Sequence, residues 1–174
     1  MGPAPPRAVS SSGGKFVLDD NTETPDTQIA VYDFPTYTLI WEHQILGGVG
    51  LGGRPHGLSF SGADGTLILD TKGWEVIPEA KKPLGVFKRT VSPDDPAFDG
   101  RPAHIRNFLD CVRSRQQPVE NLEVGHFVST VAHLGNLALR SGAKMVWDAQ
   151  QERVVDNSKA DALVRVAYRP PWSL

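Results

Sequence analysis

The sequence contains little cysteine, no excess of charge of one sign and no long apolar run. Its one cysteine, Cys111, excludes an internal disulfide and a multi-cysteine metal site. The 18 basic and 20 acidic residues give a formal net charge of -2, which does not favour capture of nucleic acid or an anionic membrane. No apolar run approaches the ~20 residues that span a bilayer, and residues 1–14 lack the apolar centre of a signal peptide. We therefore expect a cytoplasmic protein.

The length of 174 residues fits one globular domain rather than two. Residues 1–14 are rich in Pro, Gly, Ser and Ala, and such a stretch buries too little apolar surface to offset its ordering entropy. We therefore predict a flexible lead-in over residues 1–14 and one domain over residues 15–174.

The first half of the domain has short runs of alternating or β-branched residues separated by turn residues, a pattern typical of strands. The links between these runs are short, which favours antiparallel neighbours because a parallel crossover needs a dozen or more residues. The predicted strands are residues 27–34, 37–45, 56–62, 65–71, 73–78 and 85–90.

After a turn-rich linker over residues 92–102, the apolar period changes from 2 to about 3.6. This predicts one amphipathic helix over residues 104–115 and a second over residues 124–141, with Gly142 as its C-terminal stop. A shorter third helix is predicted from Ser158, and residues 145–155 can hold a further strand and turn. Strands followed by segregated helices predict an α+β fold: an open, mainly antiparallel sheet of about six or more strands, with two to three helices on one face or end.

The stretch GGVGLGG (residues 47–53) satisfies the spacing G-x-G-x-x-G through Gly48, Gly50 and Gly53. A dinucleotide-binding loop needs a helix after these glycines, because the helix N-terminus holds the pyrophosphate. Residues 54–65 instead predict a strand, so we interpret GGVGLGG as a flexible strand connection. We predict no cofactor-binding residue in this chain.

Several blocks of the sequence together resemble the C-terminal domain of the Gfo/Idh/MocA family (glucose-fructose oxidoreductase, inositol dehydrogenase, MocA). The resemblance covers roughly residues 15–174. The blocks are DDNTETPDTQ (19–28), FPTYTLIWEHQ (34–44), GLSFSGADGTLILDTKGWEVIPE (57–79), HIRNFLDCVRSRQQPVENLEVGHFVSTVAHLGNLALRSG (104–142), MVWD (145–148) and YRPPWSL (168–174).

The resemblance implies an intact enzyme that transfers hydride between NAD or NADP and a carbinol carbon of a sugar or cyclitol. In the family an N-terminal Rossmann domain holds the cofactor, and that domain, the Glu-Lys-Pro motif with the catalytic lysine and the Asp-x-x-x-His motif have no counterpart in these residues. Lys81-Lys82-Pro83 is not taken as a substitute. We therefore expect a substrate-side and oligomerisation domain that has no catalytic residue and is not competent alone. The alternative is a stand-alone structural or carbohydrate-binding module.

The candidate substrate-binding residues are Trp41, His43, Arg54 and His56. Strand alternation puts Trp41 and His43 on one face, where an aromatic ring and a polar group would suit a sugar. Sheet packing is the commoner role of such residues. Arg54 and His56, just after the glycine stretch, are in reach of a substrate hydroxyl or carboxylate, although exposed loop charges are common.

Other polar residues of the second half are assigned structural roles. His126 and His133 lie seven residues apart on a predicted helix, too far apart for one metal ion, so we predict no metal site and a capping or inter-element hydrogen bond for His126. Cys111 is predicted to be a packed thiol. The segment from Tyr168 to Leu174 is expected to dock on its own domain or on a nucleotide domain.

Alternating apolar residues in the predicted strands supply at least one apolar sheet face. They include Ile29 with Val31, and Leu39 with Trp41. Since helices cover only one side of such a sheet, we expect pairing with a second copy to cover the other, giving a homodimer or a higher oligomer.

Overall fold

The computed structural model describes residues 4–79, 88–90, 99–165 and 168–172. The chain divides into two compact units. The first consists of Met1–Ile45 with Glu120–Leu174, and the second of Leu46–Val119. Each unit is described by itself.

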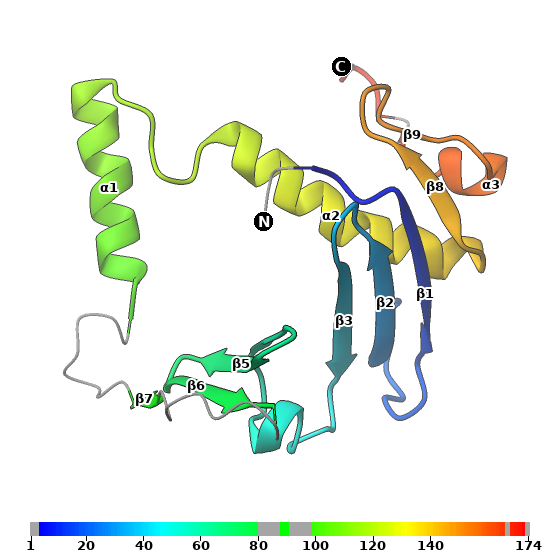
Figure 1. The fold of residues 1–174 in the computed structure, drawn as a ribbon. Coiled ribbons are helices and arrows are strands. Elements are labelled where there is room, and N and C mark those ends of the chain that lie inside the picture. The colour runs from blue at the N-terminus through cyan, green and yellow to red at the C-terminus, as the bar shows by residue number, and fades with distance from the viewer. Residues whose placement is uncertain (1–3, 80–87, 91–98, 166–167, 173–174) are drawn as a thin grey trace. The chain divides into compact units, whose positions relative to one another are not determined.

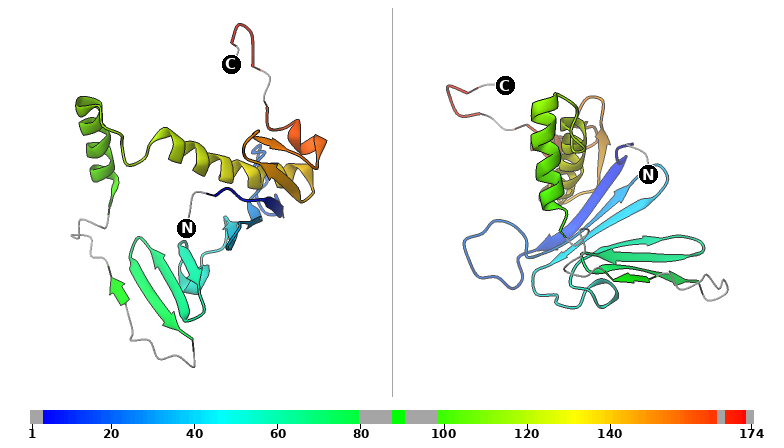
Figure 2. Two further views of the ribbon diagram at one scale, coloured as in Figure 1. Left: turned by 45° about the horizontal axis from the view of Figure 1, so that its top comes forward. Right: turned by 90° about the vertical axis from the view of Figure 1, so that its left-hand side faces the viewer.

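The first unit is built on a five-stranded antiparallel sheet with the order β3-β2-β1-β8-β9. The elements of this unit are β1 (Ala8–Gly14), β2 (Thr27–Asp33), β3 (Thr38–Gln44), α2 (Leu122–Ser141), β8 (Met145–Asp148), β9 (Arg153–Val154) and α3 (Ser158–Asp161). Helix α2 runs across one face of the sheet (Figure 1). Figure 2 shows the same layers from two further directions.

The two faces of this sheet differ in burial. We call the face that carries α2 the inner face; it includes Val9, Ala30, Tyr32, Met145 and Trp147, all of them 9% exposed or less. The opposite, outer face alternates with it along the same strands and includes Ile29, Val31, Ile40 and Val146. The core of the unit therefore lies between the inner face and the helices α2 and α3.

Helix α2 begins where the Asn121 side chain accepts the backbone N–H of Val124, and it ends at Gly142 in the left-handed conformation. Leu134, Gly135 and Ala138 form its buried stripe. A Cβ placed on Gly135 would lie 2.3 Å from Tyr32 Oη, so only glycine permits this approach of helix to strand. The predicted second helix and its glycine stop are confirmed.

The prediction of a flexible lead-in is wrong for residues 8–14. These residues form β1, which lies in the middle of the sheet and pairs with β2 along its whole length and with β8 at Ala8 and Val9. β2 pairs with the whole of this strand and β8 with its first two residues, and Val9 is buried against α2. Tertiary pairing therefore overrides the weak strand preference of a Ser- and Gly-rich segment.

The second unit contains a four-stranded antiparallel meander, β4-β5-β6-β7, and one helix. Its elements are the 3-10 turn η1 (Leu51–Gly53), β4 (Leu58–Ser61), β5 (Gly65–Asp70), β6 (Gly73–Pro78), β7 (Lys88–Thr90) and α1 (Arg101–Ser114). The predicted hairpin between the third and fourth runs is confirmed, because Ser61 pairs with Thr66 across it. Residues 81–83 and 85–87 lie outside the described residues.

Helix α1 begins three residues before the expected start at His104. Pro102 suits the first helical turn, and the Asp99 carboxylate accepts the backbone N–H of Arg101 at 3.0 Å. Its apolar stripe is as predicted from the periodicity, but none of its residues is buried, and Cys111 is only partly covered.

The α+β prediction with mainly antiparallel strands is confirmed, with the strands divided between two sheets. At the end of the chain, Tyr168 is 55% exposed and Trp172 is 69% exposed, so neither is buried on its own domain. The other expected alternative, docking on a nucleotide domain, stays a prediction. A bilayer-spanning helix is not found among the residues that the structure describes.

Candidate functional site

Trp41 and His43 lie on β3 and point to the inner face, as alternation predicts. Trp41 is opposite Ala30 and His43 is opposite Gln28 across the β2–β3 ladder. Both neighbours on β2 are buried, whereas Trp41 is 55% exposed and His43 is also exposed. The helix therefore covers the middle of the inner face and leaves this edge open.

The buried amide of Gln28 joins this open edge to the helix. Its Nε2 donates to Ser11 Oγ at 3.0 Å and to the carbonyl of Gly135 at 3.2 Å. Because both donor hydrogens are engaged with the protein, the amide fixes the strand beside His43 rather than offering a donor to a ligand.

Arg54 and His56 lie in the second unit, so the structure does not place them with Trp41 and His43. The Arg54 guanidinium donates to Asp70 Oδ1 at 2.9 Å, lies 3.5 Å from the carbonyl of Gly73 and is 3.8 Å from Glu75 Oε2. Its side chain is 19% exposed. The arginine that we predicted to meet a substrate is thus engaged in an internal ion pair.

Asp70 interacts with both Arg54 and His56, through an ion pair with the first and through charge with the second. The sequence pattern did not indicate this carboxylate as part of the candidate site. Burial raises the pKa of this carboxyl, but the Lys72 backbone N–H, the Arg54 guanidinium and the charge of His56 lower it, and the net shift is downward. A cavity of about 260 Å³ adjoins the pair and is lined by Gly53, Arg54, Pro55, Asp70, Lys72, Gly73 and Thr90.

The glycine stretch does not fit a dinucleotide. Residues 51–53 form a single 3-10 turn with Gly52 and Gly53 at positive φ, and the chain then continues to β4 without a helix. The next regular element after this turn is β4, so within residues 51–61 no helix N-terminus follows the glycines to hold a pyrophosphate. The interpretation of GGVGLGG as a strand connection is confirmed.

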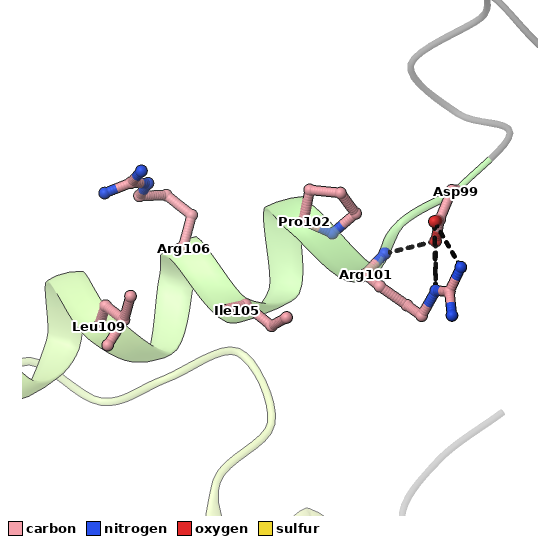
Figure 3. A pocket seen from close by; sticks show the side chains of 6 residues that line it. All are labelled: Asp99, Arg101, Pro102, Ile105, Arg106 and Leu109. Atoms are coloured by element: carbon pink, nitrogen blue, oxygen red, sulfur yellow. Dashed lines mark hydrogen bonds and ion pairs between the residues drawn. The ribbon is translucent and has the colours of Figure 1, made fainter.

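A shallow groove of about 400 Å³ runs along α1 (Figure 3). Arg101 is the obvious ligand-binding side chain there, but its Nε and Nη2 donate to both oxygens of Asp99 at 2.8 to 3.1 Å. This pairing, through the Arg101 side chain first, lowers the pKa of Asp99 to about 2. The groove therefore has one arginine, Arg101, that is already neutralised by Asp99 and a second, Arg106, beside the apolar side chains of Ile105 and Leu109.

His126 makes the inter-element contact predicted for it: its Nε2 lies 2.5 Å from Glu152 Oε1 in the turn between β8 and β9. Among the described residues, no group of three or more His, Cys, Asp or Glu side chains is placed to hold a metal ion.

Solved oxidoreductase structures share the fold of this chain. An oxidoreductase from Agrobacterium radiobacter, in complex with NAD+, L-tartaric acid and magnesium, is 13% identical with a TM-score of 0.59 over 82% of this chain and 43% of that chain. An oxidoreductase from Thermotoga maritima is 12% identical, with a TM-score of 0.59 over 82% of this chain and 41% of that chain. Aldose-aldose oxidoreductase from Caulobacter crescentus, complexed with glycerol, is 16% identical, with a TM-score of 0.58 over 82% of this chain and 42% of that chain.

These structures establish the fold, and this chain spans less than half the length of each of them. No curated protein sequence matches the chain. A Gfo/Idh/MocA family model, described as "Oxidoreductase family, C-terminal alpha/beta domain", matches residues 86–174, just over half of the chain. The chain belongs to the Gfo/Idh/MocA oxidoreductase family and contains its C-terminal α/β domain.

Proposed function

We propose that this chain is the substrate-side and self-association domain of an NAD- or NADP-dependent oxidoreductase that acts on a sugar or cyclitol. The family match to the C-terminal domain carries the proposal. The relative from Agrobacterium radiobacter that binds NAD+ and the aldose-aldose oxidoreductase support it by their chemistry. The cofactor would be held by a different domain, since the glycine stretch here lacks the helix that the pyrophosphate needs.

The open edge of the inner face is the proposed sugar-binding surface. Trp41 offers an exposed indole for the apolar C–H side of a sugar ring, and His43 stands two residues further along the same face for its hydroxyls. Arg54 and His56 are proposed as a second, polar contact region in their own unit. There Arg54 would act only if a substrate carboxylate competes with Asp70 for it.

The outer face is the proposed self-association surface. Ile29 is 43% exposed, Val31 36%, Ile40 65% and Val146 39%. Large apolar patches on a soluble domain are unusual, and a two-fold symmetric pair covers both copies of such a patch at once.

Sugar binding by the Trp41 edge can be tested by tryptophan fluorescence and saturation-transfer NMR. A panel of aldoses, sugar acids and inositols would be titrated into the wild type, Trp41→Ala, His43→Ala and the control Phe60→Ala, which removes a 40% exposed aromatic of the other unit. We expect at least one panel member to bind, about tenfold more weakly to Trp41→Ala and equally to the control. Equal binding to Trp41→Ala and the wild type would contradict the assignment.

The cofactor assignment has a separate test. Isothermal titration of NAD and NADP into these 174 residues is expected to show no binding. Micromolar binding would show that the chain holds a nucleotide site of its own and would overturn our interpretation of the glycine stretch.

A further inference from the structure

The cavity of about 260 Å³ in the second unit lies where β5 ends, β6 begins and β7 ends. Gly73, the first residue of β6, is opposite Asp70 on one neighbouring strand and Thr90 on the other. Residues directly opposite one another in an antiparallel sheet point to the same face, so Asp70 and Thr90 flank a position that has no side chain. The missing side chain of Gly73 leaves room for a ligand between them.

Asp70 has an acceptor oxygen that the protein does not use. Its side chain is 6% exposed, and its Oδ1 accepts the Arg54 guanidinium at 2.9 Å and the Lys72 backbone N–H at 2.7 Å. Among the described residues its Oδ2 has no hydrogen-bond partner, and no polar side-chain atom there is both fully buried and unpartnered. Oδ2 is therefore open to the cavity that Asp70 lines, as an acceptor for a ligand hydroxyl.

The charges around the cavity favour a ligand with one negative charge. Burial raises the pKa of Asp70, but the Lys72 backbone N–H and Arg54 lower it overall, so the carboxylate is ionised at neutral pH and neutralises Arg54. The Lys72 ammonium also lines the cavity and makes no ion pair with any residue that the structure describes. Glu75 lies 3.8 Å from Arg54 and is not among the lining residues. Lys72 is thus the surplus cation of the lining.

We propose that this cavity binds a small hydroxy acid, whose carboxylate pairs with the Lys72 ammonium while one of its hydroxyls donates to Asp70 Oδ2. The inference rests on the polar contact region proposed for Arg54 and His56, and it assigns a ligand class to that region. Arg54 keeps its bond to Asp70 and positions that carboxylate, so it does not have to exchange partners. The volume is below the 300 to 1,000 Å³ typical of drug-sized ligands and suits a molecule of about four carbons.

Both ligand groups are needed because each answers a different side chain. A plain carboxylic acid would leave Asp70 Oδ2 without a donor and bring a second negative charge towards it. A neutral polyol would leave the Lys72 ammonium unpaired. A four-carbon set separates the two contributions: threonate has a carboxylate and hydroxyls, threitol has hydroxyls only, and butyrate has a carboxylate only.

NMR titration of the ¹⁵N-labelled full chain with these three compounds tests the proposal. We expect threonate to shift the Lys72 backbone amide saturably, and threitol and butyrate to bind at least tenfold more weakly. Lys72→Ala should weaken threonate binding about tenfold, followed by the remaining shifts around the cavity. Lys144→Ala, which removes an exposed lysine of the first unit, is the matched control and should bind threonate as the wild type does.

The outcomes separate this inference from the proposed sugar surface. Equal binding of threonate and butyrate would overturn the role of Asp70, and threonate binding that Lys72→Ala leaves unchanged would overturn the role of Lys72. Sugar binding at Trp41 without any saturable shift by threonate would overturn the site and leave the sugar surface intact. Trp41→Ala should bind threonate as the wild type does; loss of binding in that variant would move the hydroxy acid to the first unit and contradict the proposal.

Discussion

The inner and outer faces of the five-stranded sheet come from the same strands, yet their side chains differ in burial. On β2, Ala30 and Tyr32 are 0% and 3% exposed beneath α2, whereas Ile29 and Val31, which alternate with them, are 43% and 36% exposed. Side-chain character does not distinguish these two sets, because both are largely apolar. The difference lies in which side α2 covers, and it shows that the apolar surface of this sheet exceeds what α2 and α3 bury.

The contrast between the faces should be largest at two consecutive residues of β8. Met145 is 0% exposed on the inner face and Val146 is 39% exposed on the outer face. Met145→Ala leaves a cavity in the core, so we expect it to reduce the free energy of unfolding by about 3 kcal/mol. Val146→Ala should cost less than about 1 kcal/mol in the monomer. Urea unfolding measures both, and equal losses would contradict the division into a packed and an open face.

The closeness of α2 to the inner face is tested by two glycines of one helix. Gly135→Ala would bring a methyl group against Tyr32, and we expect a loss of about 2 kcal/mol from overpacking. Gly125→Ala is the matched control, because a Cβ there meets nothing within 4 Å; it should stabilise the helix by up to about 1 kcal/mol. Thermal unfolding measures both variants. A shift of Tm in the same direction for both would contradict the close packing of Gly135 against Tyr32.

A smaller effect is expected from acid, at the loop between β1 and β2, where Asp26 Oδ2 accepts the backbone N–H groups of Phe16, Val17 and Leu18. The folded pKa of Asp26 is about 2, below its ordinary value of 3.8. Its contribution to stability is therefore complete above pH ~4 and is lost as the pH falls through the folded pKa. Asp26→Asn should make the decrease of Tm between pH 4 and pH 2 less steep. Asp19→Asn, which removes an exposed carboxylate from the same loop, is the control variant.

The smallest effect is predicted at the open edge of the inner face. Trp41→Ala removes a half-exposed ring that α2 does not cover, so the free energy of unfolding should change by less than about 1 kcal/mol. A loss near that of Met145→Ala, measured by the same urea unfolding, would show that Trp41 is a core residue and not a binding surface.

Periodicity predicted most of the elements because amphipathic patterns are local. The second helix, with its Gly142 stop, and the strands β2 to β6 follow from apolar spacing alone. The segment of residues 8–14 could not be predicted from composition, because its strand depends on β2 and β8, the latter more than 130 residues away. For the end of the chain, the apolar and Pro-rich composition predicts that the segment docks, but composition does not distinguish docking on its own domain from docking on a nucleotide domain.

The candidate site, too, could be predicted only where it depends on a local pattern. Alternation correctly put Trp41 and His43 on one face, since the period of a strand is fixed. The pairing of Arg54 with Asp70 joins residues 16 positions apart, at the two ends of the β4–β5 hairpin, and no spacing rule connects them.

The measurement that tests the account most directly is the mass of the chain in solution by sedimentation equilibrium, with one charge introduced on each face of β3. Ile40 faces outward and is 65% exposed, whereas His43 on the same strand faces inward. We predict a dimeric wild type, a folded but monomeric Ile40→Lys and a dimeric His43→Lys. A monomeric wild type, or an Ile40→Lys variant that dimerises as well as the wild type, would contradict the assignment of the outer face to a second copy.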